Sequence, residues 1–474
     1  MKYIRGSDRG EVLLLPEALE DYIAAENPVR FIDAFVGQLD LVAAGFTHAQ
    51  LNETGRPPYD PKDLLRLYLY GYLNRVRSTR GLEREAGRNL EVIWLLRKLR
   101  PDFKTIADFR RDNAKGIKAA GREFTLLCRR LQLFGGELVA IDSTKIKAQN
   151  AKGRNYSAAR LAALHKELEE KLSSYLAELD EADVSAGRGP EQLSAAELKE
   201  KIAHLEKRKA ELEAVAPEVA QKGQVSLTDP DSRAMSMGHG STIGYNVQAA
   251  VDAKHSLIIA TAVTQTTSDL NALGTMALQA QEALGTEKLK VVADKGYYNG
   301  KEILLCDTIG VSAYVAKPLT SANTARGLYG KERFRYDPQK NCYTCPAGQT
   351  LTYRFTSDEA GRATAYYRTT ACRACPLKPQ CTRNRGNRSI TRLGCEEVQE
   401  AMAARVKQHP QIMRRRKAII EHCFGTIKRT FGYDYFLCRG KEKVTTEINL
   451  TVLAYNLKRV CHLVGVQNLI RAVS

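Results

Sequence analysis

The sequence predicts an α/β protein in which a mixed sheet is covered by helices and preceded by an all-helical domain. Short apolar, β-branched runs at 138–142 and 289–293 have the composition of buried strands. Segments with apolar residues at helical spacing lie between and after these runs, as at 269–284. The expected order of strand, strand, strand, helix, strand, helix, strand, with a further late helix, fits a mixed sheet flanked by helices.

The chain is long and strongly basic. Its 474 residues suggest two to four domains with ample core. Lys and Arg number 72 against 54 Asp and Glu, which gives a net charge of +18. Such a surface favours polyanions, nucleic acid before anionic membranes. No run approaches the roughly 18 uninterrupted apolar residues of a membrane span, and the first residues lack the apolar core of a signal peptide, so we expect a cytoplasmic protein with no membrane partner.

A helical N-terminal domain is expected over 1–130. Several short segments there carry apolar residues at helical spacing, and basic turns at 74–81 and 108–113 separate them. Short helices joined by basic turns are typical of a helix-turn-helix-like reader of DNA. A helical bundle whose charges are simply solvated explains the same pattern, and the residues alone leave both interpretations open.

Two aspartates stand at the ends of predicted strands. Asp142 follows the run 138–142, and Asp294 ends a similar run that closes in a turn at Gly296. A buried strand that ends in an acid delivers a carboxylate to the edge of the sheet. Four other acids are rivals for a role in a site, but turn or capping roles explain each of them: Asp229, Asp231, Asp252 and Asp269.

A third acid, Glu421, lies in a predicted amphipathic helix over 412–428. At 100° per residue it falls within about 40° of three basic residues, while the apolar residues of this helix gather on another face. The basic neighbours of Glu421 are Arg414, Lys417 and Lys428. Asp142, Asp294 and Glu421 therefore form a set of oxygen ligands that suits two Mg²⁺ or Mn²⁺ ions, which in such sites lie about 4 Å apart.

These motifs resemble bacterial insertion-sequence transposases of the DDE type, in the large group with a ribonuclease-H-like catalytic domain. The resemblance lies in the strand end 141–144, in the segment 293–297, and in Glu421 with Lys428 seven positions after it. The family signature places Tyr, Arg, Glu and Lys along one helix. Here Arg414 stands in the place of Tyr and Lys417 in the place of Arg, so the positive charge is kept but the aromatic ring is absent.

The resemblance implies a ribonuclease-H-like sheet and an activity on DNA. Water and then a 3′ hydroxyl would attack phosphodiesters at the ends of a mobile element, with metals held by Asp142, Asp294 and Glu421. Lys428, Arg414 and Lys417 would hold phosphates near the scissile bond. The family further implies binding of terminal repeats and target DNA, a nucleoid-associated homodimer, and cut-and-paste movement that includes hairpinned ends in some members.

The expected catalytic domain is interrupted twice. Its first part spans 131–330, with a charged helical hairpin inserted at about 157–215 that serves as a scaffold or a dimer contact. Its last part, with the Glu421 helix, spans 396–474. Lys145 follows the first acid closely, and we expect it to contact a phosphate.

A cysteine-rich insertion is expected over 331–395. Paired Cys-x-x-Cys knuckles predict a zinc ribbon, because such turns present thiolates together for a tetrahedral site. An iron–sulfur cluster and reduced, unpaired thiols are the alternatives. The five candidates exceed the four ligands required, with Cys381 the expected surplus unless it replaces Cys375. The candidates are Cys342, Cys345, Cys372, Cys375 and Cys381.

A basic run follows the cysteines. Its arginines alternate with Asn and Gly, a composition typical of a loop that tracks the DNA backbone. They are Arg383, Arg385, Arg388 and Arg392.

Two other functions compete with transposition. A catalytically silent DNA-binding protein derived from a transposase would share the basic charge and the zinc, but the presence of all three acids argues against it. A zinc-dependent hydrolase is disfavoured because an all-thiolate site is closed and because no His-x-x-x-His motif accompanies the cysteines.

Overall fold

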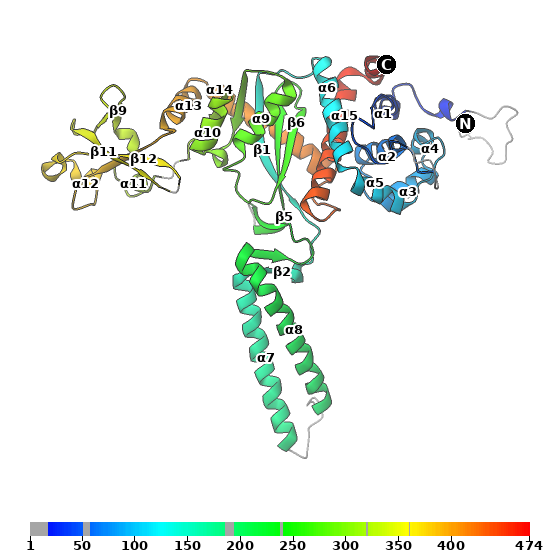
Figure 1. Cartoon of the computed structure of the whole chain (residues 1–474), viewed down its shortest axis with the longest axis horizontal. Helices are drawn as coiled ribbons and strands as arrows, with labels where there is room; N and C mark the ends of the chain where they lie inside the picture. The colour runs from blue at the N-terminus through cyan, green and yellow to red at the C-terminus, as the bar shows by residue number, and fades with distance from the viewer. Residues whose placement is uncertain (1–17, 51–56, 185–193, 238–239, 319–320, 360) are drawn as a thin grey trace, which may run out of the picture.

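The computed structural model describes residues 18–50, 57–184, 194–237, 240–318, 321–359 and 361–474. A central α/β domain carries three projections (Figure 1): a group of N-terminal helices, a small β domain on the opposite side, and a long helical hairpin that extends away from both. The first residues of the predicted N-terminal domain lie outside the described ranges. Across the described residues, no helix is both long enough and apolar enough to span a membrane.

The central domain is built on a mixed six-stranded sheet, so the predicted sheet class is confirmed. The strand order is β4-β5-β1-β7-β8, and β6 also pairs with β5. β1 runs antiparallel to β5 and parallel to β7, and β7 runs parallel to β8. The strands are β1 (Leu138–Lys147), β4 (Arg233–Met237), β5 (Gly240–Asp252), β6 (Ile258–Thr264), β7 (Leu289–Ala293) and β8 (Val311–Val315).

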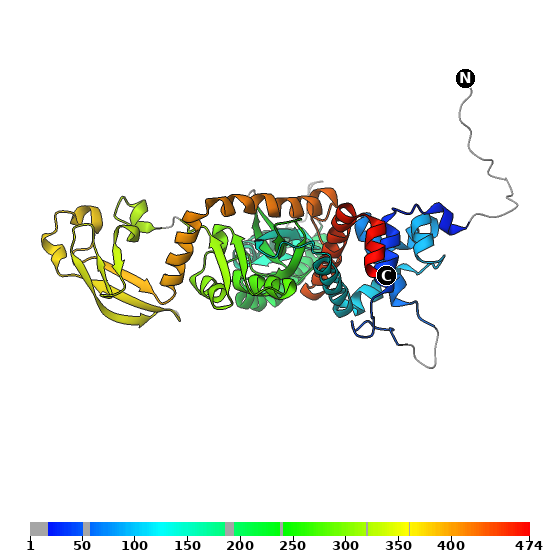
Figure 2. The same cartoon turned by 90° about the horizontal axis from the view of Figure 1, so that it is seen from above.

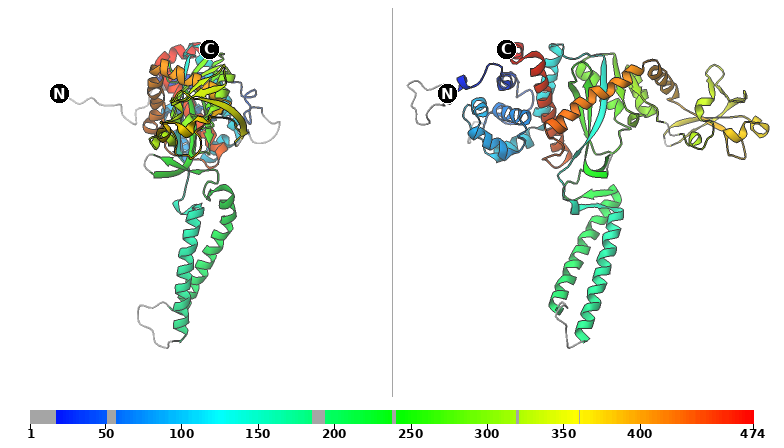
Figure 3. Two further views of the ribbon diagram at one scale, coloured as in Figure 1. Left: turned by 90° about the vertical axis from the view of Figure 1, so that its left-hand side faces the viewer. Right: turned by 180° about the vertical axis from the view of Figure 1, so that it is seen from behind.

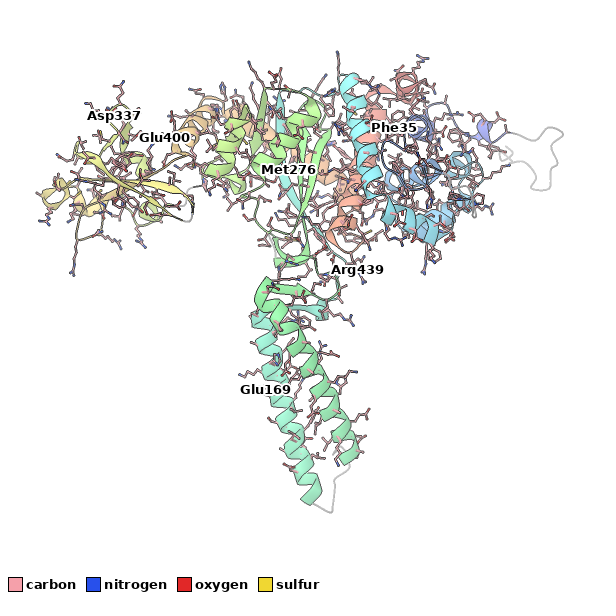
Figure 4. The ribbon with its side chains drawn as sticks, viewed as in Figure 1. Phe35, Glu169, Met276, Asp337, Glu400 and Arg439 are labelled. Carbon is pink, nitrogen blue, oxygen red and sulfur yellow. The ribbon has the colours of Figure 1, made fainter. Side chains whose placement is uncertain are left out.

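The alternation of side chains along β1 and β7 decides which face carries the acids. Val139 and Ile141 of β1 pack with α9 (Leu273–Leu284) and α10 (Gly300–Thr308) on one face of the sheet. Ala140 belongs to the core on the other face. Because successive residues of a strand point to opposite faces, Asp142 shares the face of Ala140. The label of Met276 in Figure 4 marks α9 over the sheet.

Helices from the C-terminal part cover the face that carries Asp142. α14 (Pro410–Gly425) contacts β1, β5, β7 and β8, and α15 (Lys441–Val464) packs beside it. Figure 3, in its right-hand view, shows α14 running across the sheet towards α15. Ile419, Ile420 and Cys423 are the buried residues of α14, which ends in a π-helical turn, η6 (Thr426–Thr430).

The N-terminal helices share one hydrophobic core with α15. Arg77, in one of the predicted basic turns, joins the two regions. Its guanidinium lies 4.2 Å from the ring centroid of Tyr433 and 4.8 Å from that of Tyr435, and it donates to the carboxylate of Glu447 at 3.2 Å. This arginine is buried, so it serves packing rather than DNA. The helices are α1 (Pro28–Gly37), α2 (Pro61–Leu73), α3 (Thr79–Arg88), α4 (Leu90–Leu95), α5 (Phe103–Asp112) and α6 (Ala114–Arg130).

The hairpin consists of α7 (Ala158–Val184) and α8 (Ala195–Lys222), and it projects away from the central domain (Figures 1 and 3). α8 continues past 215, the expected end of the inserted hairpin, to the left-handed Gly223. Buried apolar side chains gather near its base, beside the short strands β2 (Asn155–Ser157) and β3 (Gln224–Ser226). Farther out the helices carry surface ion pairs, as between Glu169 and Lys209 at 3.2 Å.

The cysteine-rich segment forms a five-stranded antiparallel sheet in the order β13-β12-β11-β10-β9. It has a small core of its own, made of Phe334, Tyr343, Leu351, Tyr367 and Ile390. α13 (Glu396–Gln408) links this domain to α14, as the view from above shows (Figure 2). The strands are β9 (Arg335–Asp337), β10 (Cys342–Thr344), β11 (Thr350–Asp358), β12 (Ala363–Arg368) and β13 (Ser389–Leu393).

Candidate active site

Asp142 lies under α14 in the middle of β1, directly after the fully buried run 138–141. Its Oδ1 accepts the backbone N–H of Ser143 at 2.8 Å, and its Oδ2 accepts from Nη1 of Arg416 at 2.5 Å. Burial raises the pKa of the Asp142 carboxyl above its usual range, the Arg416 guanidinium opposes that rise, and the charge of Asp294 adds to it. A carboxylate in this position is costly to ionise unless a cation stands beside it.

Asp294 lies close enough for its charge to act on Asp142. Val292 of β7 packs into the same core as Ala140, and the alternation along the strand directs Asp294 to that face as well. Its Oδ1 accepts the N–H of Gly296 at 2.8 Å, which caps the short helix η3 (Lys295–Tyr297). A Cβ at position 296 would lie 3.0 Å from this same oxygen, so the turn favours glycine.

Glu421 is not with the two aspartates. Its side chain is 63% exposed on the outer side of α14, where it pairs with Lys417 at 3.6 Å. Arg416 faces the sheet, and Glu421 lies five residues on, about 140° further round the helix. Within the described part of the chain, no group of three or more His, Cys, Asp or Glu residues is arranged as a metal-ligand set.

The residues predicted to bind phosphate differ in their contacts and in their burial. Lys428 in η6 donates to the carbonyl of Lys145 at 2.8 Å, and burial lowers the pKa of its ammonium. Nζ of Lys145 reaches Oγ of Ser143 at 3.0 Å and Oδ2 of Asp269 at 3.4 Å. Arg414 is exposed on α14, as Lys417 is.

Sequence reasoning missed the role of Arg416. On the helix it shares the phase of Ile420, Cys423 and Ile427, which are buried. A basic residue in the apolar stripe of an amphipathic helix signals a charge that needs a buried partner, and here the partner is Asp142. This pattern is visible in the sequence.

Three of the rival acids have turn or structural roles. Asp252 accepts backbone N–H groups of Gly135 and Lys254, and Asp229 accepts the hydroxyl of Tyr245. Oδ2 of Asp231 accepts the N–H of Lys441 at 2.9 Å. The fourth rival, Asp269, belongs to a polar cluster on the α9 side of the sheet, where it accepts from Asn246 at 2.7 Å and from Gln248 at 2.6 Å.

Four of the five candidate cysteines surround one small cavity in the β domain: Cys345, Cys372, Cys375 and Cys381. Burial raises the pKa of the Cys381 thiol, Arg388 opposes the rise, and the other three cysteines add to it. Cys342 lies in β10, where it is buried and paired with Asp337 and Thr352, and it does not line the cavity. Cys381 thus shares the cavity with the knuckle residues and Cys342 lies apart, although the described thiols do not form a metal-ligand set in this structure.

The basic run divides into two kinds of arginine. Arg383 and Arg385 are exposed. Arg388 turns inward, donating to the carbonyls of Cys381 at 3.3 Å and Tyr329 at 3.2 Å. Arg392 also turns inward, pairing with Glu400 at 2.8 Å, a residue that Figure 4 marks at the junction with the central domain.

Two protein-family models match the chain. The model described as "Transposase DDE domain" matches residues 344–461, which include α14 and most of α15, and "Transposase domain (DUF772)" matches residues 17–112 in the N-terminal helices. No curated protein matched. Among solved structures, a cryo-EM structure of a piggyBac transposase synaptic complex with hairpin DNA matches with a TM-score of 0.31 and 8% identity, covering 94% of this chain and 79% of that chain. Both matched descriptions name a transposase, and together they support an insertion-sequence transposase of the DDE type.

Proposed function

We propose that this transposase cuts and joins DNA at the ends of its element through Asp142, Asp294 and Glu421. The observation that carries the proposal is the position of Asp142 and Asp294. Asp142 lies in the middle of β1 and Asp294 directly follows the neighbouring parallel strand β7, on the face that α14 crosses, and the charge of Asp294 acts on Asp142. A carboxyl whose pKa is raised by burial and by a neighbouring acid marks a candidate reaction centre.

We also propose that the central domain is ribonuclease-H-like. Its first strands, β1, β5 and β6, form an antiparallel unit, and β7 and β8 then add in parallel on the free side of β1. The acids of β1 and β7 are thereby brought side by side, although 294 − 142 = 152 positions separate them in the chain.

The donor chemistry of the aspartate pair fits Mg²⁺ or Mn²⁺, which prefer carboxylate oxygens. When bound there, such ions would lower the pKa of a nucleophilic water and stabilise the leaving oxygen. Arg416 supplies the positive charge beside Asp142 in this structure. Glu421 can join the two aspartates only if α14 rotates about its axis relative to the sheet. The π-helical turn η6 holds one extra residue per turn at the end of this helix, and such turns are frequent at functional sites.

The remaining residues would act on DNA itself. Lys428 is held against β1 through the carbonyl of Lys145, and Arg414 and Lys417 lie exposed on α14, so all three can hold phosphates along the helix that carries Glu421. Their role is to orient the scissile phosphodiester for attack by water and then by the 3′ hydroxyl. Lys145, turned to the Asp269 side, is assigned to shaping the strand end rather than to a phosphate.

Binding of the terminal repeats is assigned to the N-terminal helices within 1–130, and target DNA is the second partner. A homodimer is proposed for the active complex, with the hairpin α7–α8 as its contact, and its place of action is the nucleoid in the cytoplasm. The buried Arg77 fixes the N-terminal helices to the segment that follows α14, so terminal DNA would be held in register with the aspartate pair.

A structural zinc ion is proposed for Cys345, Cys372, Cys375 and Cys381. They line one cavity, and four thiolates suit zinc and leave no open position for catalysis. Arg388, which opposes the rise in the pKa of Cys381, would offset part of the negative charge of such a site.

One observation favours a second function, a catalytically silent DNA-binding protein. Arg416 holds Asp142, and Glu421 faces solvent. A cleavage assay on DNA that flanks the gene separates the two functions. The transposase should nick that DNA at the element ends in the presence of Mg²⁺. Tight, repeat-specific binding without any nicking, in Mg²⁺ and in Mn²⁺, would favour the silent protein.

A further inference from the structure

A stacked aromatic pair lies on the outer face of the cysteine-rich sheet, and its Phe355 is exposed while its Tyr366 is half-buried. The ring of Phe355 in β11 is stacked on that of Tyr366 in β12, with centroids 4.7 Å apart and planes 16° from parallel. Phe355 is 44% exposed, an unusual position for a phenylalanine in the middle of a strand. Large apolar side chains that gather at a surface usually mark a binding site.

An irregularity in β11 turns Phe355 away from the core of this domain. Tyr353 pairs with Tyr367, whereas Phe355 pairs with Tyr366, so the register shifts by one residue between them. Tyr353 therefore stays on the core side, 6.0 Å from the buried ring of Tyr367. A β-bulge that re-aims a side chain in this way is typical of functional surfaces.

Positive charge accompanies the pair on one side. The guanidinium of Arg368 lies 5.8 Å from the ring centroid of Phe355 and 6.0 Å from that of Tyr366. Arg354, at the bulge, is exposed. The hydroxyl of Tyr366 donates to Glu359, so a polyanion approaching this face would follow the Arg368 side.

We propose that Phe355, Tyr366 and Arg368 form a stacking platform for unpaired DNA. The proposal rests on the proposed function only in taking DNA as the substrate. The ring of Phe355 offers a flat face to a nucleobase, which can stack there only when it is not enclosed in a duplex, and Arg368 supplies charge for the adjoining phosphate. The platform consists of aromatic rings and an arginine, and its described residues form no pocket that would read the edge of a base. We therefore expect it to bind DNA without sequence preference.

The test compares an oligothymidylate with a duplex of the same length, by fluorescence anisotropy on the full chain without divalent cations. Phe355→Leu keeps an apolar side chain but removes the stacking ring. It should weaken binding of the single strand by about 5- to 100-fold, the loss expected for one stacked base, and leave duplex binding nearly unchanged. Arg368→Gln should also weaken single-strand binding and reduce its log–log salt dependence by about 0.7.

Tyr353→Leu is the matched control, because it removes a ring of equal exposure from the same strand on the core side. It should change neither binding curve. Photocross-linking of an oligonucleotide that carries 5-iododeoxyuridine should in addition label the peptide that contains Phe355.

Three results would overturn the platform: unchanged single-strand affinity in Phe355→Leu, equal loss on both DNA forms, or a change of oligomeric state at unchanged DNA affinity, which would assign this face to a second copy. The assay does not depend on catalysis, because it measures binding in the absence of divalent cations. A protein that never nicks DNA but binds the oligothymidylate through Phe355 would refute the proposed function and keep the platform.

Discussion

At the scale of single residues, Asp142 shows how a buried acid is tolerated. Its environment raises its pKa, and Arg416 on the helix above provides the opposing charge. Both side chains are 22% exposed, so the pair is shielded from solvent without being sealed. A cation beside this carboxylate therefore stabilises its charged form, whether arginine or metal supplies it.

The first prediction concerns the aspartates. Asp142→Asn and Asp294→Asn keep the shape of each side chain but remove the charge that a metal needs. Each variant should bind terminal DNA normally and lose Mg²⁺-dependent nicking by at least about 100-fold, which corresponds to about 2.7 kcal/mol of the barrier.

A suitable control is Asp307→Asn. Asp307 is an exposed acid near the end of α10, shortly before β8 begins. The variant should nick normally. Near-normal nicking by Asp294→Asn would remove that residue from the site, and Glu421→Gln asks the same question of the third acid.

The second prediction concerns Arg416→Gln. Without the guanidinium, the pKa of Asp142 should rise further, because burial is then opposed only by the Ser143 amide. When the pKa of a carboxyl is higher in the folded than in the unfolded protein, the folded protein loses stability as the pH rises above the carboxyl's ordinary titration range. Above that range the folded protein must hold an unpaired charge. The variant should be less stable at pH 7 by about 1–3 kcal/mol, less than for a fully buried pair because both groups are partly exposed.

Thermal denaturation between pH 4 and pH 8 measures this loss, which should shrink towards the acid end. Adding Asp142→Asn to Arg416→Gln should restore most of it at pH 7. If the loss were the same at every pH and the second change restored nothing, the arginine would act through packing rather than through charge.

At the scale of elements, the sequence predicts where strands and helices lie better than how they face each other. The apolar runs that end in Asp142 and Asp294 lie in β1 and β7, but β1 continues to Lys147, because polar residues can pair with β5 at the open end of the sheet. Helix periodicity separates Glu421 from the buried side of α14. It does not show that Arg416 meets Asp142, because that ion pair depends on how the helix crosses the sheet.

The cysteines show a similar division. The Cys-x-x-Cys spacing predicts that knuckle residues approach one another, and Cys345, Cys372 and Cys375 do line one cavity. The spacing does not show that β10 directs Cys342 elsewhere, or that α12 (Lys378–Cys381) brings Cys381 to the group. The first depends on the pairing of β10 with β9 and β11, and the second on a contact between distant segments, in which the N–H of Tyr329 donates to the carbonyl of Gln380.

The third prediction tests that assignment. Purified, reduced protein should contain about one zinc per chain. Each of four variants should lose this zinc, with partial unfolding of the β domain, because metal binding and folding are coupled. The variants are Cys345→Ser, Cys372→Ser, Cys375→Ser and Cys381→Ser. Cys342→Ser is the matched control and should keep its zinc, even if burying a hydroxyl lowers its stability. Absence of zinc from fresh protein would leave the group as ordinary thiols, and loss of zinc only on changing Cys342 would reverse the assignment.

At the scale of the whole molecule, the structure separates a basic residue packed against the central sheet from basic residues on the distant β domain. Lys428 is held against β1 beside the central sheet, whereas Arg383 and Arg385 are exposed on the β domain at the far end of α13 and α14 (Figure 2). Arg388 belongs with neither group, because its guanidinium is occupied by the carbonyls around the cysteines.

The last prediction follows from that separation. Lys428→Met keeps the apolar stem but removes the charge beside the reaction centre, so it should lower the cleavage rate far more than DNA affinity. Replacing Arg383 and Arg385 by Ala should weaken binding to matched and scrambled terminal DNA alike. It should also reduce the log–log salt dependence by about 0.9 for each phosphate that the variant no longer neutralises, because basic side chains on the DNA backbone act through counterion release.

Arg388→Ala is the control: it should disturb the β domain without this change in salt dependence. The measurement is a pair of salt titrations, one on each DNA. A double variant that loses only the matched site would mean that this loop reads bases, and the N-terminal helices would then no longer be the sole candidates for recognition of the terminal repeats.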